Sequence, residues 1–471
     1  MPVYLPKEIW RKLSVEPEDF ATTLPQRPER AGGVRNIQGN GLMSDATNRR
    51  SETVAIDEVI TTVIMARVTD FFGFFVYAIA SVLVFPRLFF PMYDSVTATL
   101  LSFAVFSIAF LARPLGAILG DALQRRTSAP VRIMAALMVF GSSTVAIGLL
   151  PGYDAIGWTA PALLMALRIA QGVGLGGAFD GITLQLQNLA PEGRKGLYGM
   201  VPQLGGPIGF CVAASLFYVL VGFLEDDEFI DFGWRFAFFG VMAVNVVSLF
   251  ARLRLLSAGF GAEIIAPKSA PIIPMIREQW EPIAISAFMP LASYALFHMV
   301  TVFPLAYALL YTELDIDYVL LLQFLAGVLG VCATIASGVL SDRFGRPKVL
   351  GFCTLAIPLL CLTIPLLPSY PSIYIFAGFI LLGLAHGQSS AIAPARFKPE
   401  YRYSGAAVSI NLSWIVGAAF APLVGLALTA AFGLEASALY LLSGAVVTGY
   451  VLYARYGAAA FKISWASTEE N

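Results

Sequence analysis

Five polar or aromatic residues recur at helical spacing inside one apolar stretch, and two of them are charged. At intervals of 3, 4, 3 and 4 they are Arg67, Asp70, Phe74, Tyr77 and Ser81. Residues three and four apart share one helix face, and a charge that faces lipid costs at least about 2.5–3.5 kcal/mol. The face therefore predicts either the wall of a water-accessible cavity or an Arg67–Asp70 pair that locks helices together.

Arg168 is a further charge in the middle of an apolar block, with no acidic residue near it in sequence. Arginine stays protonated and presents a planar fork that suits a carboxylate. The alternatives are an ion pair with Asp70 from a neighbouring helix, contact with an anionic substrate, or alternation between the two.

Three other residues are candidates to bind or move a proton. Asp180 follows the glycines of 172–177, and His298 and His386 are the two histidines of the chain. Histidine titrates near neutral pH, so a histidine on a cavity wall can carry a proton. His298 shares a helical face with Tyr294, which favours the cavity wall. The alternatives are a hydrogen-bonded packing residue for either histidine and a solvated helix end for Asp180.

The composition indicates a membrane protein. Of 471 residues, 58% are hydrophobic and 13% charged, whereas a soluble domain is about half apolar and a quarter charged. The net charge of −1 gives no basic field for nucleic acid. The four cysteines lie in apolar blocks without paired spacing, so we expect core residues and neither disulfides nor a metal site.

The apolar residues form blocks that are long enough for helices of about 20 residues, which cross a bilayer. Transmembrane strands would be about ten residues long with alternating polarity. We therefore predict an all-α polytopic membrane protein with twelve transmembrane helices, at residues 57–84, 96–120, 130–150, 158–188, 200–223, 234–256, 279–311, 317–341, 347–367, 371–394, 404–430 and 436–457.

Lysine and arginine in the loops predict the orientation, because they favour the cytoplasmic side. With both termini in the cytoplasm, the opposite loops hold only Arg87 and Arg235 and are otherwise acidic. The cytoplasmic loops then hold Arg125, Arg126, Arg132, Arg194, Lys195, Arg252, Arg254, Lys268, Arg277, Arg343, Arg346, Lys348, Arg396, Lys398 and Arg402.

A repeated sequence motif divides the chain into two halves. ILGDALQRR (118–126) follows the second block and VLSDRFGRPK (339–348) follows the eighth. Two halves of the same order favour parallel repeats that rock against each other. We expect a disordered cytoplasmic tail (1–55), a six-helix bundle (56–256), a cytoplasmic linker (257–278), a second six-helix bundle (279–457) and a short cytoplasmic tail (458–471).

The two loop motifs also have a mechanical interpretation. Asp121 and Asp342 lie at predicted helix ends, where a carboxylate can accept bonds from the free N–H groups of a neighbouring helix start. With Arg343 and Arg346 they predict a latch between the bundles that opens in one access state. The alternative is that these charges only fix the orientation in the membrane.

Several segments resemble a known family. GVLSDRFGRPK (338–348) resembles the cytoplasmic loop signature of the major facilitator superfamily. More specific segments resemble its metabolite:proton symporters, and these are ARPLG (112–116), LRIAQGVGLGG (167–177), APEGRKGLYG (190–199), PQLGGPIGF (202–210), GWRFAFFG (233–240) and RYSG (402–405).

This resemblance implies a twelve-helix carrier of small organic acids, amino acids or betaines, such as α-ketoglutarate, citrate, proline or shikimate. Members of the family usually move their solute with protons across bacterial inner membranes. The chain departs from the family pattern where Gly73, Ala178 and Ala395 replace acids, which bears on proton coupling. Asp70, the acid left on the first stripe, is then the predicted proton carrier.

The leading hypothesis is a secondary carrier of a small carboxylate or zwitterion, taken up with protons by alternating access through the plasma (inner) membrane. The alternatives are an exporter or uncoupled carrier of a carboxylate-rich metabolite, and a membrane sensor that does not transport. No nucleophile–base pattern predicts an enzyme, and no cofactor is expected. The expected partners are the substrate, protons and the lipid bilayer, with the chain as a monomer and no nucleic acid.

Overall fold

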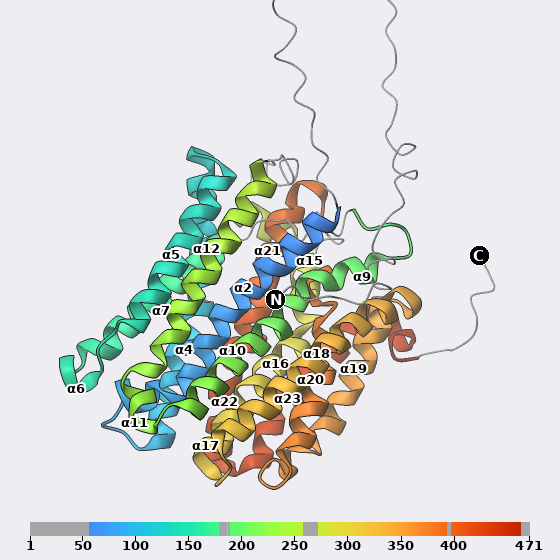
Figure 1. Ribbon diagram of the computed structural model, residues 1–471. Helices are drawn as coiled ribbons and strands as arrows, with labels where there is room; N and C mark the ends of the chain where they lie inside the picture. Colours follow the sequence, from blue (N-terminus) through green and yellow to red (C-terminus); the bar gives the residue numbers. More distant parts are fainter. Residues whose placement is uncertain (1–55, 179–185, 187–188, 258–271, 393–396, 463–471) are drawn as a thin grey trace, which may run out of the picture.

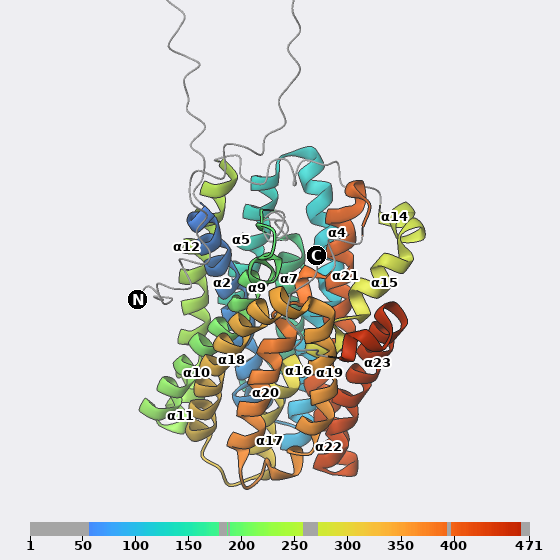
Figure 2. The ribbon, with the colours of Figure 1, turned by 90° about the vertical axis from the view of Figure 1, so that its right-hand side faces the viewer.

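The computed structural model describes residues 56–178, 186, 189–257, 272–392 and 397–462, and this part of the chain is helical with no strand. The predicted tail of 1–55, most of the linker and the last nine residues lie outside the described residues. Figures 1 and 2 show long helices that run between two ends of the molecule, with α11 and α17 at one end and α14 at the other.

The first half contributes six spans. They are α2 (Ile56–Leu83), α4 (Ser95–Arg126), α5 (Ala129–Gly148), α7 (Thr159–Gly177), α9 with η2 and α10 (Lys195–Met200, Val201–Leu204 and Gly205–Phe223), and α12 (Arg235–Ser257). Short turns join them at α3 (Phe85–Phe89), α6 (Tyr153–Ile156), α11 (Asp226–Glu228) and the π turn η3 (Phe229–Gly233).

The second half is more broken. Its spans are α15, α16 and α17 (Trp280–Phe288, Leu291–Thr301 and Phe303–Tyr311), α18 (Ile316–Phe344), α19 (Arg346–Cys361), α20 (Pro371–His386), α21, η8 and α22 (Arg402–Ser413, Trp414–Ala419 and Ala421–Phe432), and α23 (Ala438–Tyr456). Shorter elements are α14 (Ile272–Glu278), η4 (Ile364–Leu366), η5 (Ser389–Ala391), η7 (Pro399–Tyr401), η9 (Leu434–Ser437) and η10 (Gly457–Phe461).

Prolines explain two of the breaks. Pro290 precedes α16 and Pro304 lies in the first turn of α17, where the missing N–H does not cost a helical hydrogen bond. The predicted block of residues 279–311 is therefore three short helices in line. In the predicted block of 404–430, the π-helical turn η8 interrupts the span and begins at Trp414. Such turns are frequent at functional sites.

Eleven helical segments of the described residues are long and apolar enough to cross a membrane. The remaining span, α19, has 16 helical residues and continues into the short η4 turn. Together they make the predicted twelve-helix fold. In Figure 1 the spans of the first half (α4, α5, α7, α10 and α12) lie to the left of α18, α19, α20 and α23 of the second half.

The orientation leads to a prediction. Reporter domains fused after Gly152, Phe229 and Glu313 should lie outside the cell, and those fused after Arg126 and Lys268 inside. The reason is the excess of basic residues at the end of the molecule that carries Arg126. Alkaline phosphatase and green fluorescent protein fusions measure this directly, and a consistent reversal would contradict the orientation.

Candidate functional site

A central cavity lies between the two halves and has a volume of about 120 Å³. One water molecule needs about 10–15 Å³ of such volume, so the cavity has room for a small organic molecule with water. Helices of both halves supply the wall, which includes Arg67, Asp70, Phe71, Phe74, Arg113, Gln203, Arg252, Tyr294, His386, Ser390, Asn411 and Trp414.

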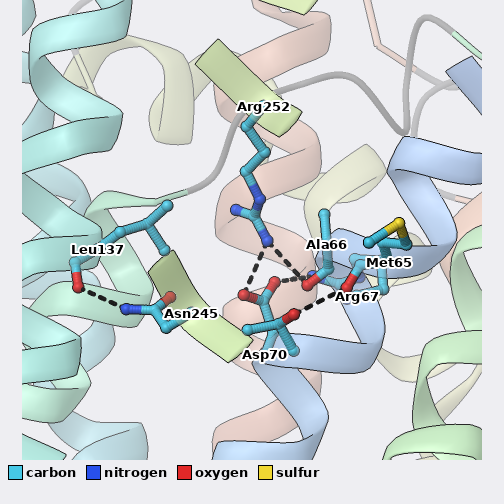
Figure 3. Close-up of polar contacts among 8 residues, drawn as sticks. Met65, Ala66, Arg67, Asp70, Leu137, Asn245 and Arg252 are labelled. Atoms are coloured by element: carbon cyan, nitrogen blue, oxygen red, sulfur yellow. Dashed lines mark hydrogen bonds and ion pairs between the residues drawn. The ribbon is translucent and has the colours of Figure 1, made fainter. Parts of the chain in front are cut away.

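Asp70 is held by two arginines (Figure 3). Nη2 of Arg252 lies 2.8 Å from Oδ1 of Asp70, and Nη1 of Arg67 lies 3.5 Å from Oδ2. Nη2 of Arg252 also donates to the carbonyl of Ala66 at 2.9 Å. The prediction that placed Arg252 in a loop is wrong, because it lies inside α12 with 1% of its surface exposed.

Arg113 lines the same cavity from α4, and its guanidinium contacts two aromatic rings. Its guanidinium lies over the ring of Phe110 at 4.8 Å and over that of Trp414 at 5.1 Å. No described residue accepts a hydrogen bond from its buried Nε. Cation–π contacts contribute about 0.5–2 kcal/mol each, but they give Nε no oxygen acceptor. A ligand with a carboxylate would supply one.

Close packing of α4 against α7 positions Arg113. A Cβ atom on Gly176 would lie 2.0 Å from the carbonyl oxygen of Arg113, and one on Gly172 would lie 2.2 Å from that of Ala109. These glycines let the two backbones touch, as small residues do between membrane helices.

Replacing Gly176 by alanine should therefore push α4 away from α7. We expect a loss of stability of about 1–3 kcal/mol, typical of overpacking, together with weaker ligand binding at Arg113. Thermal unfolding in detergent measures the first effect. Gly222→Ala is the matched control, since nothing lies within 4 Å of a Cβ at that position. Equal stability of the two variants would contradict the role of this contact.

Arg168 does not pair with Asp70, which corrects one of the alternatives predicted for it. It is 1% exposed and donates through Nε and Nη2 to the carbonyl of Phe106, at 3.2 Å each, and through Nη1 to Gln171 at 3.0 Å. Its guanidinium lies 3.7 Å from the ring centre of Tyr77. The predicted stripe thus divides, because Arg67 and Asp70 line the cavity while Tyr77 is buried beside Arg168. A direct substrate role for Arg168 or Tyr77 stays a prediction.

His298 lies in an aromatic layer instead of on the cavity wall. Ring centres of Phe74, Phe106 and Phe297 lie 5.2 Å from its own. Neither ring nitrogen has a hydrogen-bond partner among the described residues, and the side chain is fully buried. Phe74 follows Asp70 by one turn toward the predicted external end of α2. The layer therefore closes the cavity on that side, and the hydrogen bond from Ser107 to the carbonyl of Ala419 joins the two halves there at 2.6 Å.

His386 is the histidine that reaches the cavity, at the end of α20. Its Nδ1 lies 3.5 Å from Oγ of Ser293 and 3.4 Å from Oγ of Ser389. The sequence left open whether His386 lines a cavity or packs in the core, because the pattern of an all-apolar span does not show which face turns inward.

Asp342 connects the halves at the predicted cytoplasmic end. Its carboxylate accepts hydrogen bonds from the backbone N–H groups of Gly196 at 2.5 Å and Leu197 at 3.1 Å, at the start of α9. Arg346 donates to the carbonyl of Lys195 at 2.6 Å, and Gln388 to that of Gly196 at 3.1 Å. This is the geometry of the predicted latch.

The other latch candidates differ. Arg343 lies over the ring of its neighbour Phe344 at 5.3 Å. Asp121 pairs at 3.9 Å with Arg132 of its own half, and its predicted bond to a helix start stays a prediction. Arg132 in turn donates to the hydroxyl of Tyr403 across the halves at 3.0 Å. Asp180 lies outside the described residues.

The charges of the cavity decide what it can hold. Among the described lining residues, Arg67, Arg113 and Arg252 face one acid, Asp70, a net of two positive charges. Such a surplus on the wall of one cavity favours an anion, and the aromatic walls suit its carbon skeleton. The described residues contain no group of three or more metal-ligand side chains.

Comparison with known proteins agrees with this architecture. The model of the Major Facilitator Superfamily matches residues 70–408. An inner membrane metabolite transport protein of Escherichia coli (strain K12) is 36% identical over 83% of this chain and 92% of its own length. A citrate-proton symporter of Klebsiella pneumoniae is 28% identical over 80% and 85%. The crystal structure of a D-xylose-proton symporter covers 83% of this chain and 97% of its own with a TM-score of 0.62 at 15% identity, which shows a common fold.

These relatives are membrane transporters, as the sequence motifs predicted, and the chain is a transporter of metabolites and not an enzyme. By the match over most of its helical part, it belongs to the major facilitator superfamily.

Proposed function

We propose that this protein takes up a small organic anion across the plasma (inner) membrane by alternating access, coupled to protons, with both termini in the cytoplasm. The observation that carries the proposal is Arg113, which lines the cavity and whose buried Nε has no acceptor in the described chain. A substrate carboxylate is the group that would complete its hydrogen bonds.

The charge of the cavity supports an anion over a neutral solute. Three arginines and one aspartate form its charged wall, so the positive surplus would repel the cationic group of a zwitterion. A neutral sugar has no negative charge to pair with the arginines, and water would have to accept their hydrogen bonds. A relative is named a citrate-proton symporter, and citrate is an anion of the same chemical class.

The two closures of the cavity supply the gates of the proposed cycle. The bonds from α9 to Asp342 close the predicted cytoplasmic end, and the aromatic layer around His298 closes the opposite end. Release inside would break the first closure, and binding from outside would open the second. One proton that crosses about 100 mV together with a neutral solute supplies about 2.3 kcal/mol, enough for a roughly fiftyfold gradient of that solute. A singly charged anion with one proton has no net charge, so the pH difference drives its uptake, at about tenfold accumulation per pH unit.

An uncoupled carrier or exporter is the second candidate. It is favoured by the bonds that tie both oxygens of Asp70 to arginines, since a carboxylate engaged on both oxygens fits a structural ion pair between helices.

The experiment is a ligand panel on the purified protein. Benzoate, succinate and citrate should raise the melting temperature, because a ligand that binds only the folded state stabilises it. Xylose, proline and betaine, a neutral sugar and two zwitterions, are the controls. Stabilisation by a zwitterion or sugar and by no carboxylate would contradict the proposal. Exchange of the stabilising acid in proteoliposomes then separates a carrier from a sensor.

A further inference from the structure

The ring of His386 is almost fully buried, with 4% of its surface exposed, yet it lines the central cavity. Trp414 separates it from Arg113, with the indole centre 5.9 Å from the imidazole and 5.1 Å from the guanidinium. Which of its two nitrogens carries hydrogen follows from its neighbours.

Both neighbouring hydroxyls have already donated their hydrogen. Ser293 donates to the carbonyl of Pro290 at 2.8 Å, and Ser389 donates to the carbonyl of His386 itself at 2.8 Å. A hydroxyl has one hydrogen to donate, so each oxygen is left to accept from Nδ1 at 3.5 and 3.4 Å. From these contacts we assign the hydrogen of the neutral ring to Nδ1 and the lone pair to Nε2.

No described residue hydrogen-bonds to Nε2, in contrast to the acid of the cavity. Asp70 has one arginine on each oxygen, at 2.8 and 3.5 Å. Protonation of Asp70 would break at least one of these charge-assisted bonds, while protonation of Nε2 would break none. Of the two, His386 is the base that is free to accept a proton in the cavity.

The charges around His386 oppose that proton while the cavity is empty. Arg67 and Asp70 on α2, Arg113 on α4, Arg252 on α12 and Tyr294 on α16 line the same cavity. His298 on α16 adjoins it through Phe297. The residues of α10 and α18 near it, such as Phe210 and Thr334, are uncharged. The net of two positive charges repels a third.

We propose that His386 takes up the transported proton, and that it does so when an organic anion has entered the cavity. This rests on the proposed function, because the anion is the one bound at Arg113. The proton adds to the Nε2 lone pair from water and is returned to water on release, so no bond of the anion changes. The anion offsets the positive charge that disfavours the proton, and the proton adds to the positive charge that attracts the anion. By linkage each raises the affinity of the other by the same factor. Anion and proton then bind and leave together, which is symport.

The test does not need the natural substrate. Because the chain has two histidines, magic-angle-spinning NMR of protein labelled with ¹⁵N-histidine in nanodiscs gives two imidazoles to follow. His298→Gln and His386→Gln assign them. Arg113→Gln removes one positive charge without a ligand and should increase the proton affinity of His386 about tenfold, as expected for one charge several Å away at an effective dielectric constant of about 20.

Arg67→Gln is a second variant with the same charge change, for the case that Arg113→Gln does not fold. In the unmutated protein, saturating citrate, succinate or benzoate should increase the protonated fraction of His386 at the same pH. If the protonated fraction of His386 is the same in the unmutated protein and in both charge variants, the proposal is overturned, whether or not a carboxylate binds. If no carboxylate binds but the charge variants shift His386, the proposed function fails and the electrostatic coupling stands.

Transport supplies the second readout. In proteoliposomes, His386→Gln should lower the ratio of uptake driven by a pH gradient to exchange at equal pH, measured with the acid that stabilises the protein. Asp70→Asn and His298→Gln should each still respond to the gradient, whatever their rates. A response that is lost in Asp70→Asn or His298→Gln and kept in His386→Gln would assign the proton to that residue instead.

Discussion

Arg113→Gln should weaken the binding of carboxylates by roughly tenfold to a hundredfold. A hydrogen bond to a charged group contributes about 1.5–3 kcal/mol, and a bidentate pair adds geometric specificity. Glutamine keeps a polar side chain of similar size but has neither the charge nor the fork. Titration calorimetry with the acid that raises the melting temperature measures the effect.

Two variants control this result. Arg113→Lys keeps the charge without the fork, so affinity should fall to an intermediate value. Arg168→Gln removes an arginine whose donors are taken up by Phe106 and Gln171, so it should lower stability more than affinity. If Arg168→Gln abolishes binding in a folded protein and Arg113→Gln does not, Arg168 contacts the substrate as the sequence suggested.

Asp342→Asn should release the closure at the predicted cytoplasmic end. The carboxylate accepts one backbone N–H bond on each of its oxygens at the start of α9. Asparagine has one acceptor oxygen, so it can replace one of these bonds without the charge, and it turns its NH2 group toward the other N–H. A loss of about 1.5–3 kcal/mol shifts the balance between closed and open forms by roughly 10- to 100-fold. We expect faster amide hydrogen exchange in residues 195–200 and a fall in transport rate of about tenfold or more.

Asp121→Asn is the matched control for the latch. Its carboxylate pairs with Arg132 of the same half, so the exchange of residues 195–200 should stay close to that of the unmutated protein. If Asp342→Asn leaves both exchange and transport as they are, the bonds between α9 and Asp342 only fix the resting packing. The remaining explanation for the basic loop residues is then orientation in the membrane.

The fold could be predicted from the sequence because membrane insertion depends on block length and loop charge, and both can be read without knowledge of packing. The breaks could not. Pro290 and Pro304 indicate where a helix can break, but whether the pieces stay in line is decided by their neighbours. The π turn at Trp414 has no sequence signal of its own, although it places the indole between Arg113 and His386.

The candidate site was predicted only in part, for the same physical reason. A charge inside an apolar block must find a partner, but the sequence does not say which. Arg168 donates to a backbone carbonyl and to Gln171, whereas Arg252 forms an ion pair with Asp70 on another helix. The bonds of Asp342 agree with the expectation that a carboxylate at a helix end accepts from the free N–H groups of a neighbouring helix start. Asp121 at the matching position pairs with Arg132, so the motif alone does not decide the partner.

Exchange of a labelled carboxylate in proteoliposomes tests the central claim most directly. The internal acid is unlabelled, and the competitors outside are the same acid and its uncharged amide, which match in shape and differ in charge. We predict rapid exchange that the acid inhibits and the amide does not, and that is lost in Arg113→Gln. Equal inhibition by the amide, or full exchange in Arg113→Gln, would contradict the recognition of an anion by this cavity.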